Sequence, residues 1–347
     1  MGGWIMGGGP QNNIILSSRI RLARNISNIP FPAALDVQSS DKISAMVEEV
    51  FKKGKKVSAK YKRIDISELS PLDKQVLVER HVVSPNLVRQ SSNGAAIVSD
   101  DEVVSIMINE EDHIRLQTIM PGFQIKKAWE LSSAIDDMME KKLEYAFDEK
   151  WGYLTCCPTN VGTGMRASVM VHLPALAITG NINKILQAVN QIGLTSRGLY
   201  GEGTEAVGDI FQISNQITLG RSEEEIVENL AAVTSQIIGK EYEARNILLE
   251  NNRLQIEDRI WRSLGILKNA RIMQSQECMR LLSDIRLGVD LKIIDDIPVS
   301  VLNGIMTDVQ PASLQKSFQS EMGPGERDYY RAELIRKRLE EYKEEQV

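Results

Sequence analysis

The sequence lacks the features that would place the protein at a membrane or in an oxidising compartment. It has no run of about 18 apolar residues that could form a membrane-spanning helix. Its N-terminal stretch has neither the basic start nor the apolar core of a signal peptide. The three cysteines, Cys156, Cys157 and Cys278, form no disulfide framework and no Cys-x-x-Cys metal pattern. These absences favour a cytoplasmic protein without a membrane attachment.

Positive charge is also scarce. The 41 lysines and arginines are outnumbered by 47 acidic residues, which gives a net charge of −6. A chain of this charge is not expected to bind nucleic acid directly, so any cluster of arginines is a local feature. The Gly-x-x-x-x-Gly-Lys-Ser/Thr phosphate loop is absent, and no Gly-x-Gly-x-x-Gly follows a strand. Two common nucleotide-binding motifs are therefore excluded.

The patterns that are present divide the chain of 347 residues into two parts. The first part mixes strand and helix patterns, whereas strand patterns vanish from about Glu241 onward. Strands are expected over Asn13–Ala23, Ala95–Val98, Val103–Asn109 and Asp209–Gln216, and helices over Asp41–Lys52, Leu72–His81, Ile125–Phe147 and Pro174–Ile192. Ser222 and Glu225 form a capping box before a long helix. We expect a catalytic domain over residues 1–240 and an all-α domain over residues 241–347.

The stretch Leu154–Pro174 is the most informative one in the first part. A strand-like run breaks at Cys157-Pro158, passes a loop with Gly162 and Gly164, and resumes at Arg166. A glycine loop lets backbone N–H groups approach a ligand, and an arginine after it can bind a phosphate through two hydrogen bonds. A plain turn between two core strands explains the spacing equally well. The stretch alone does not decide between these readings.

Arginines in similar settings occur elsewhere in the first part. Arg19 and Arg21 share one face of the first expected strand, where they repel each other unless an anion lies between them. Three more arginines adjoin loops or strand ends: Arg115, Arg166 and Arg197. Arginine stays charged at any relevant pH, and each arginine–phosphate hydrogen bond contributes on the order of 1.5–3 kcal/mol. Five such residues in an acidic protein indicate a polyphosphate site.

Four segments in the first part resemble the guanidino (phosphagen) kinases: Ser17–Arg24, Asn109–Arg115, Leu154–Ala167 and Arg197–Asn215. Enzymes of this family transfer the γ-phosphoryl group of Mg-ATP to a guanidinium nitrogen. The resemblance implies an α/β (α+β) catalytic domain with an antiparallel-rich sheet flanked by helices. It also implies that ATP and Mg²⁺ are required, with no metal site built from protein residues alone.

The resemblance assigns catalytic roles to Glu111, Cys157 and Glu202. A guanidinium has a pKa above ~12, so its nitrogen becomes nucleophilic only when a nearby carboxylate takes a proton. Glu111 matches the family's catalytic glutamate, and Glu202 is the candidate for a second carboxylate. Cys157 matches the active-site cysteine, whose thiolate would lie beside the substrate guanidinium. Cys156 stands where creatine kinases have threonine.

The resemblance further implies a set of nucleotide-contacting positions. They are Ser17, Ser18, Arg19, Ile20, Arg21, His81, Arg115, Arg166, Ala167, Ser168, Val169, Met170, Arg197, Gly198, Leu199, Tyr200, Gly201 and Glu202. Creatine and arginine kinases have a histidine at the position of Met170, so the contact to adenine or ribose is expected to differ. His81 by residue type alone fits a helix end or a core position as well as a ligand contact.

Two further features suggest a protein as the acceptor. Creatine and arginine kinases carry a helical domain before the strand that begins here near residue 14, and that domain helps to close the site over a small substrate. Without it, the site is expected to admit an arginine on another protein. Near the C-terminus, Arg327, Asp328, Arg331 and Ala332 resemble the phosphoarginine-recognition motif of bacterial protein arginine kinases, which implies an allosteric site. An ordinary surface pair of arginines one helical turn apart is the alternative.

The sequence thus predicts ATP-dependent phosphorylation of arginines on proteins. The resemblance implies a bacterial stress response, with a Clp-type protease, a heat-shock repressor and a small activator protein as partners. One alternative is a kinase for free arginine or another small guanidino compound. Another is a catalytically silent adaptor that binds phosphoarginine. Whether the protein forms a homodimer is left open.

Overall fold

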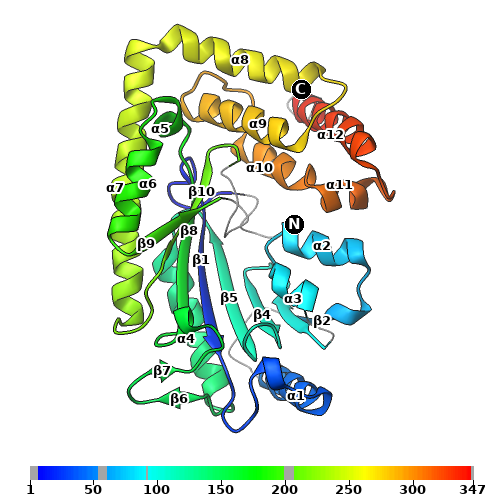
Figure 1. The fold of residues 1–347 in the computed structure, drawn as a ribbon. Helices are drawn as coiled ribbons and strands as arrows, with labels where there is room; N and C mark the ends of the chain where they lie inside the picture. Colours follow the sequence, from blue (N-terminus) through cyan, green and yellow to red (C-terminus); the bar gives the residue numbers. More distant parts are fainter. Residues whose placement is uncertain (1–6, 54–60, 91–92, 199–206, 345–347) are drawn as a thin grey trace.

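One antiparallel sheet forms the centre of the molecule (Figure 1). In the computed structural model, which describes residues 7–53, 61–90, 93–198 and 207–344, its eight strands follow the order β2-β3-β4-β5-β1-β8-β10-β9. The strands are β1 (Ile15–Arg24), β2 (Tyr61–Asp65), β3 (Ala95–Ser99), β4 (Val104–Ile108), β5 (Ile114–Pro121), β8 (Met165–His172), β9 (Leu194–Arg197) and β10 (Ile210–Asn215). Two short strands, β6 (Phe147–Asp148) and β7 (Gly152–Tyr153), form a separate pair. The expected antiparallel-rich sheet is confirmed.

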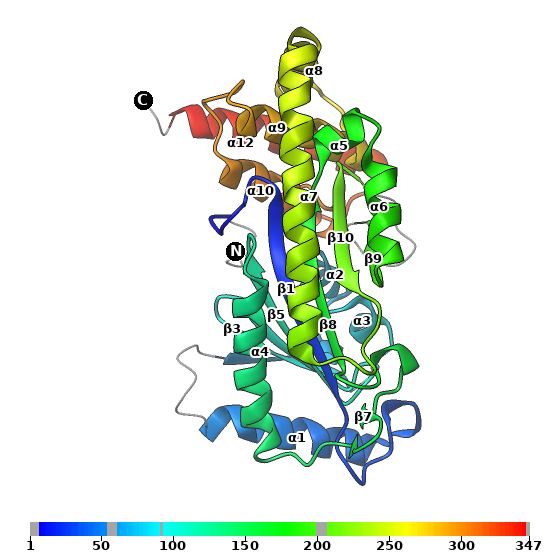
Figure 2. The same ribbon diagram turned by 90° about the vertical axis from the view of Figure 1, so that its left-hand side faces the viewer.

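Helices cover one face of this sheet, lie over part of the other face, and gather at one of its ends (Figures 1 and 2). Those of the first part are α1 (Val37–Lys53), α2 (Pro71–Glu79), α3 (Pro85–Gln90), α4 (Ile125–Glu140), α5 (Pro174–Ile178) and α6 (Ile182–Gln191). They are followed by α7 (Glu223–Asn251), α8 (Arg253–Asn269), α9 (Ser275–Asp290), α10 (Val299–Asp308), α11 (Pro311–Phe318) and α12 (Pro324–Glu344). Short 3-10 turns are η1 (Pro32–Ala34), η2 (Ile66–Glu68) and η3 (Pro158–Asn160). No helix among the described residues is long and apolar enough to cross a membrane.

Strand β1 shows why the two faces of the sheet differ. Successive side chains of a strand point to opposite faces, so the alternation in the sequence separates two kinds of residue. Ile20 and Leu22 are fully buried on the face that α4 covers. Arg19 and Arg21 lie on the other face, which is left open to a cavity. The two arginines therefore occupy the face that the sequence pattern predicts.

The expected single helix over Pro174–Ile192 is wrong. The structure has two helices, α5 and α6, which are separated at Thr179–Asn181. Gly180 adopts a φ of +71°, a left-handed conformation that glycine adopts readily and that ends α5. The apolar periodicity of the sequence continues past Gly180, so the periodicity did not reveal the break between the two helices.

Helix α7 begins as expected and extends beyond the expected domain boundary. The Ser222 hydroxyl accepts a hydrogen bond from the Glu225 N–H at 3.1 Å, and the Glu225 carboxylate accepts one from the Ser222 N–H at 2.9 Å. The capping box is therefore confirmed. The expected boundary after residue 240 lies inside α7, which continues without a break to Asn251.

Buried polar contacts attach the helical end to the sheet part. Glu79 at the end of α2 accepts hydrogen bonds from the N–H groups of Ala312 and Ser313 at the start of α11, each at 2.8 Å. His172 of β8 and Ser283 of α9 are joined by a hydrogen bond of 2.8 Å. Buried polar groups are costly when they lose their partners, so these contacts fix the relative position of the two parts.

A buried ion pair fixes the glycine loop to β1. The Arg24 guanidinium donates to one oxygen of Asp136 through Nε at 3.0 Å and Nη2 at 2.7 Å. Its Nη1 donates to the backbone carbonyl of Thr163, between the two loop glycines, at 2.9 Å. The other Asp136 oxygen accepts from the Tyr145 hydroxyl at 3.0 Å. Arg24 therefore connects α4, β1 and the glycine loop through one side chain.

Replacing Asp136 by asparagine should destabilise the fold by about 3 kcal/mol, because it removes the nearer carboxylate from the buried charge of Arg24 and leaves only the longer ion pair with Glu223, at 3.4 Å. Urea unfolding of the purified chain measures this loss. Asp137→Asn is the matched control, because Asp137 is the next residue of α4 and is exposed. The control should change the free energy of unfolding by less than about 0.5 kcal/mol. Equal losses in the two variants would contradict the role given to the ion pair.

Candidate active site

The register of the sheet collects the arginines on its open face. Arg21 of β1 lies opposite Arg166 of β8 and opposite Gln117 of β5. Arg197 of β9 lies opposite Gln212 of β10. Directly opposed residues of antiparallel strands share a face, so side chains that are far apart in sequence become neighbours. Five strands thereby supply one continuous polar surface.

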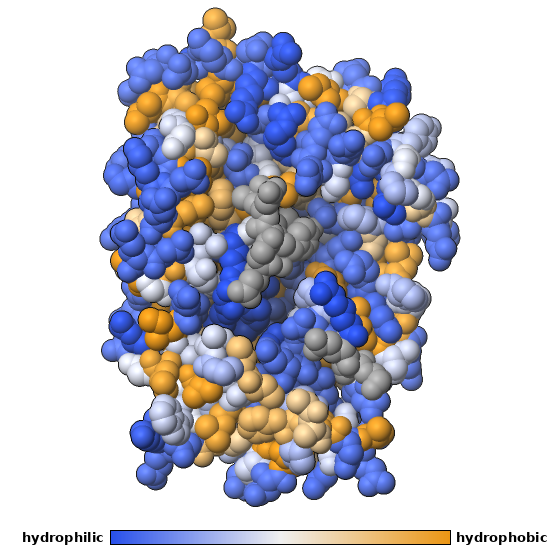
Figure 3. Space-filling view, viewed as in Figure 1, coloured by the Kyte–Doolittle hydropathy of each residue, from blue (hydrophilic) through white to orange (hydrophobic). Residues whose placement is uncertain are grey.

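A cavity of about 300 Å³ lies over this surface, and Figure 3 shows the same side of the molecule hollowed near its centre among hydrophilic residues. One wall is the sheet, and the other is formed by the end of α2 and the start of α3. The sheet contributes Arg19, Arg21, Arg115, Arg166, Arg197, Met107, Gln117 and Gln212; the other wall contributes Val78, His81, Val83, Ser84, Pro85 and Asn86. All five arginines named from the sequence line this one cavity.

Burial and mutual repulsion both act on the arginines of this cavity. Burial, then the charges of Arg166 and Arg115, lowers the pKa of Arg19 to about 10. The pKa of Arg21 is also lowered, well below its usual value, by burial first and then by Arg19. The Arg21 Nε is buried and has no hydrogen-bond partner within the described structure. A bound anion would accept this hydrogen bond and offset the repulsion.

His81 lies in the positive electrostatic field of the same arginines. It follows α2 with a φ of +57°, and its backbone carbonyl accepts a hydrogen bond of 2.7 Å from the Gln117 side chain. Burial, then Arg19 and Arg21, lower the pKa of His81 to about 3. The imidazole is therefore neutral near pH 7 and adds no further positive charge to the cavity.

Anion binding should raise the pKa of His81 by about 1–3 pH units, because negative charge beside the ring favours its protonated form. NMR titration of the imidazole protons with and without ATP measures this change. The two other histidines, His113 and His172, are buried outside the cavity and serve as internal controls. An unchanged His81 titration at saturating ATP would show that the phosphates do not bind beside it.

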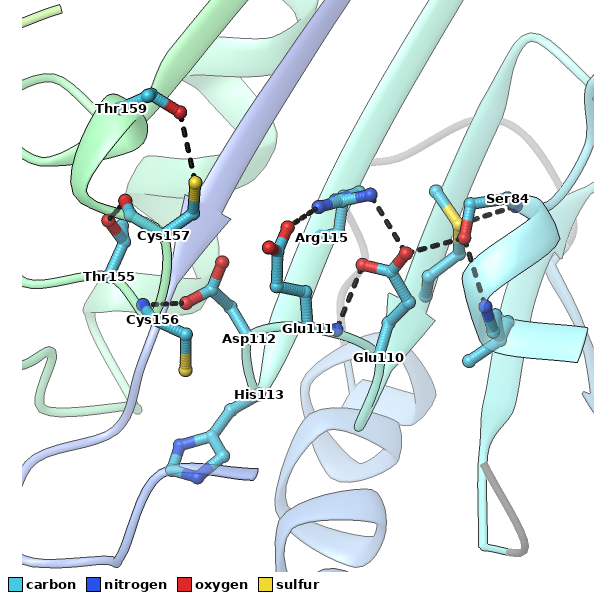
Figure 4. A network of polar contacts seen from close by, with 12 residues as sticks. Ser84, Glu110, Glu111, Asp112, His113, Arg115, Thr155, Cys156, Cys157 and Thr159 are labelled. Atoms are coloured by element: carbon cyan, nitrogen blue, oxygen red, sulfur yellow. Dashed lines mark hydrogen bonds and ion pairs between the residues drawn. The ribbon is translucent and has the colours of Figure 1, made fainter. Parts of the chain in front are cut away.

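One arginine connects this cavity to two carboxylates, as Figure 4 shows. Arg115 donates through Nη1 to Glu110 at 2.9 Å and through Nη2 to Glu111 at 2.7 Å. The Glu110 side chain is fully buried, and it also accepts from the Ser84 hydroxyl at 2.6 Å and from the Glu111 N–H at 3.0 Å. The Glu111 side chain is 35% exposed. Glu110 thus positions Arg115, whereas the Glu111 side chain remains partly exposed.

A second cavity, of about 430 Å³, adjoins Glu111. Its polar lining includes Asp36, Glu110 and Glu111, together with Cys156. The apolar part of its lining comes from η1 and the segment that leads into α1. Glu111 therefore lies between an arginine-lined cavity and one that contains carboxylates, a geometry that can bring an anionic donor and a cationic acceptor together.

The adjacent cysteines have different surroundings (Figure 4). One oxygen of the buried Asp112 accepts hydrogen bonds from the Cys156 N–H and from the Asn25 side chain, both at 2.7 Å. Burial, then Asp112, raise the pKa of the Cys156 thiol to about 12. The Cys157 sulfur lies 3.0 Å from the Thr159 hydroxyl. Cys156 rather than Cys157 lines the second cavity, and the catalytic role of Cys157 remains a prediction.

A thiol reagent should therefore modify Cys157 before Cys156, because only the thiolate reacts and Cys156 stays protonated at pH 8. Cys278 is fully buried, and its pKa is also raised to about 12, so it should not react. Peptide mass mapping after limited treatment with iodoacetamide identifies the labelled residue. Preferential labelling of Cys156 would show that Asp112 does not keep its thiol protonated.

The structure places the side chains of only part of the expected nucleotide set on the cavity face. The side chains of Ser18, Ile20, Ala167 and Val169 lie on the opposite face of the sheet, because they alternate with Arg19, Arg166 and Ser168. Ser18, for example, donates to the Gly122 carbonyl at 2.8 Å and cannot reach the cavity. Ser17, Ser168 and Met170 lie on the cavity face.

The remaining part of that set lies on the second glycine loop. Gly198 is buried directly after β9. Leu199, Tyr200, Gly201 and Glu202 lie outside the described residues, so the roles expected for them stay predictions.

Several site residues were not indicated by the sequence. Gln212 accepts a hydrogen bond from Arg19 at 2.6 Å, and Ser214 accepts two from Arg166 at 3.3 and 3.4 Å. Only the pairing of β8 with β10 reveals these contacts, since neither residue has a motif of its own. Glu110 lies among four consecutive polar residues, and nothing in the sequence separates it from Glu111.

The motif near the C-terminus lies on α12, far in sequence from the arginine cavity. Arg331 is 2% exposed and donates to the carbonyls of Val309 at 3.0 Å and Met273 at 2.8 Å, and to Asp328 at 2.6 Å. Arg327 donates to the Met322 carbonyl at 2.8 Å. Ala332 is buried. The alternative of an ordinary surface pair of arginines is wrong, because Arg331 is buried and donates to carbonyls of two other segments.

Comparison with known proteins gives the family. The ATP:guanido phosphotransferase C-terminal catalytic domain matches residues 42–244, and the protein-arginine kinase McsB C-terminal domain matches residues 253–347. The chain belongs to the protein-arginine kinase branch of the ATP:guanido phosphotransferases. It is 50% identical to the protein-arginine kinase of Halothermothrix orenii over 97% of this chain and 96% of that protein. It is 51% identical to that of Pelotomaculum thermopropionicum, over 96% and 94% of the two chains.

Solved structures of guanidino kinases share the fold of this family. A lombricine kinase is 27% identical, with a TM-score of 0.60 over 68% of each chain. The duplicated taurocyamine kinase from Schistosoma mansoni is 22% identical, with a TM-score of 0.59 over 77% of this chain and 38% of that chain. The second likeness supports the fold alone. The expected fold class is thereby confirmed.

Proposed function

We propose that this protein transfers the γ-phosphoryl group of ATP to arginine side chains of proteins. The position of Arg115 carries this proposal, because one guanidinium lines the arginine cavity and also holds Glu111, which faces the second cavity. Relatives that are about half identical over nearly their full length are named protein-arginine kinases. Donor, carboxylate and acceptor would then lie in that order across the site.

The arginine cavity would hold the polyphosphate of ATP. Arg19, Arg21 and Arg166 surround a space in which a buried N–H still lacks an acceptor. Charge-assisted hydrogen bonds from arginine to phosphate are short, strong and directional. Phosphoryl transfer depends mainly on positioning and on neutralising charge in a loose transition state, which is what a rigid set of arginines provides.

Glu111 would orient the acceptor guanidinium and take its proton. Its carboxylate is held by Arg115 at 2.7 Å and is still accessible from the second cavity. A carboxylate can bind two N–H groups of a planar guanidinium at once and so fix the nitrogen that attacks. The thiolate of Cys157 would add negative charge nearby, as the resemblance implies. Glu110 acts through Arg115 and need not touch either substrate.

Magnesium would enter with the nucleotide. Within the part of the chain that the structure describes, no group of three or more histidine, cysteine, aspartate or glutamate side chains could hold a metal ion. Mg²⁺ often keeps several water ligands and binds mainly to the phosphates of its substrate. Its chemistry here would be to neutralise phosphate charge while the arginines hold the remaining oxygens.

The biological setting is proposed from the family resemblance. We place the enzyme in the cytoplasm, where phosphorylated proteins would be directed to a Clp-type protease during stress. A heat-shock repressor and a small activator protein would be further partners. The motif on α12 would bind phosphoarginine as an allosteric site, with Arg327 and Asp328 as contacts; Arg331 would first have to release the carbonyls it binds.

Two alternative functions differ from the phosphorylation of protein arginines. A kinase for free arginine would use the same carboxylate and arginines, and only its choice of acceptor would differ. A silent phosphoarginine-binding adaptor would not need Glu111 beside a complete set of arginines. The relatives named protein-arginine kinases favour the protein acceptor over both.

Glu111→Gln should lower the rate of phosphoryl transfer at least about a hundredfold, because it removes the general base and keeps the size of the side chain. The assay incubates the full chain with Mg-ATP and an unfolded arginine-containing protein, and it measures acid-labile phosphoarginine by mass spectrometry. Affinity for ATP should change little, because the other arginines of the cavity are untouched. Glu149→Gln, a change at an exposed position, is the control. Normal turnover in Glu111→Gln would exclude Glu111 as the base.

A further inference from the structure

The second cavity is larger than its catalytic task requires. Only the tip of an acceptor arginine has to reach Glu111, whereas the cavity measures about 430 Å³ and extends to η1 and the start of α1. Volumes of a few hundred Å³ are typical of sites that bind a complete ligand. The additional space therefore needs an occupant besides the guanidinium.

The lining of this cavity combines the catalytic candidate with an apolar wall. Glu111 and Cys156 belong to the lining. Pro32, Ala33, Leu35 and Val37, from η1 and the start of α1, supply its apolar part. Val37 is 64% exposed although it is apolar, and Ala33 is also exposed. Below the central hollow, Figure 3 shows an apolar area on this side of the molecule.

Asp36 adds a charge to this apolar wall. It is exposed, and its Oδ1 accepts a hydrogen bond from the Ser39 N–H at 2.7 Å, which keeps the pKa of the carboxyl low. An acidic side chain entering the cavity would meet this carboxylate as well as that of Glu111. The cavity therefore favours a ligand that is positively charged at one end and has no acidic group beside it.

We propose that this wall, Pro32–Val37, binds the residue next to the acceptor arginine, and that the enzyme prefers extended protein segments in which this residue is apolar. The inference rests on the proposed function, because it assigns the acceptor arginine to Glu111. The proposed substrate class is therefore a protein segment in which an apolar residue adjoins the acceptor arginine.

Three peptides test the preference. They have the same length and one arginine each, flanked on both sides by leucine, alanine or aspartate, and the full chain phosphorylates them with Mg-ATP. The leucine peptide should have a KM about fivefold lower than the alanine peptide, because part of an apolar side chain leaves water. The aspartate peptide should have the highest KM. The kcat values should agree within about a factor of two, because the contact forms in the ground state as well as in the transition state.

Substitutions in Pro32–Val37 test whether these residues cause the preference for leucine beside the arginine. Val37→Asp should abolish the advantage of the leucine peptide over the alanine peptide. Leu254→Ser is the matched control, because Leu254 is 75% exposed on α8 and outside both cavities, and it should keep the advantage. Equal KM values for the three peptides, or a leucine advantage that survives Val37→Asp, would overturn the inference and leave the kinase activity established. Absence of phosphoarginine on every peptide and on an unfolded protein would overturn the proposed function itself.

Discussion

The site is organised by the repulsion among arginines that the sheet forces together. Arg19, Arg21 and Arg166 lie on neighbouring central strands, and burial, followed by their mutual repulsion, lowers the pKa values of Arg19 and Arg21. The fold tolerates this repulsion because the opposite face of the same strands is a dense apolar core under α4 and α7. The apolar core on one face thereby stabilises the strands whose other face carries the arginines. An anion bound to that face would offset the repulsion among them.

The proposed order of phosphoryl donor and guanidinium acceptor follows from side chains that each contact two neighbours. Arg115 binds both Glu110 and Glu111, so one buried carboxylate determines the position of the arginine and the arginine determines that of the exposed carboxylate. Asp112 follows Glu111 in the same turn and accepts a hydrogen bond from the Cys156 N–H. A change in this turn would move the carboxylate and the cysteine loop together.

The sequence predicted several strands and helices of the first part, because alternation, helical periodicity and capping residues depend only on neighbouring residues. Alternation revealed β1 and placed Arg19 and Arg21 on one face, and the capping box located the start of α7. Contacts that depend on strand register were not predictable, such as those of Gln212 and Ser214, and neither was the inward direction of Arg331, which depends on how α12 packs. The side chains of Ile20 and Val169 lie on the face away from the cavity, because alternate residues of a strand face opposite sides, so their expected contacts with the nucleotide stay predictions.

The most direct measurement of the central claim is the unfolding temperature of the full chain with AMP, ADP, ATP and tripolyphosphate, each over a range of concentrations. A ligand that binds only the folded state raises this temperature according to its affinity. If the arginine cavity binds polyphosphate, stabilisation should increase from AMP to ATP, and tripolyphosphate alone should also stabilise the protein. Equal stabilisation by AMP and ATP, with none by tripolyphosphate, would contradict the account.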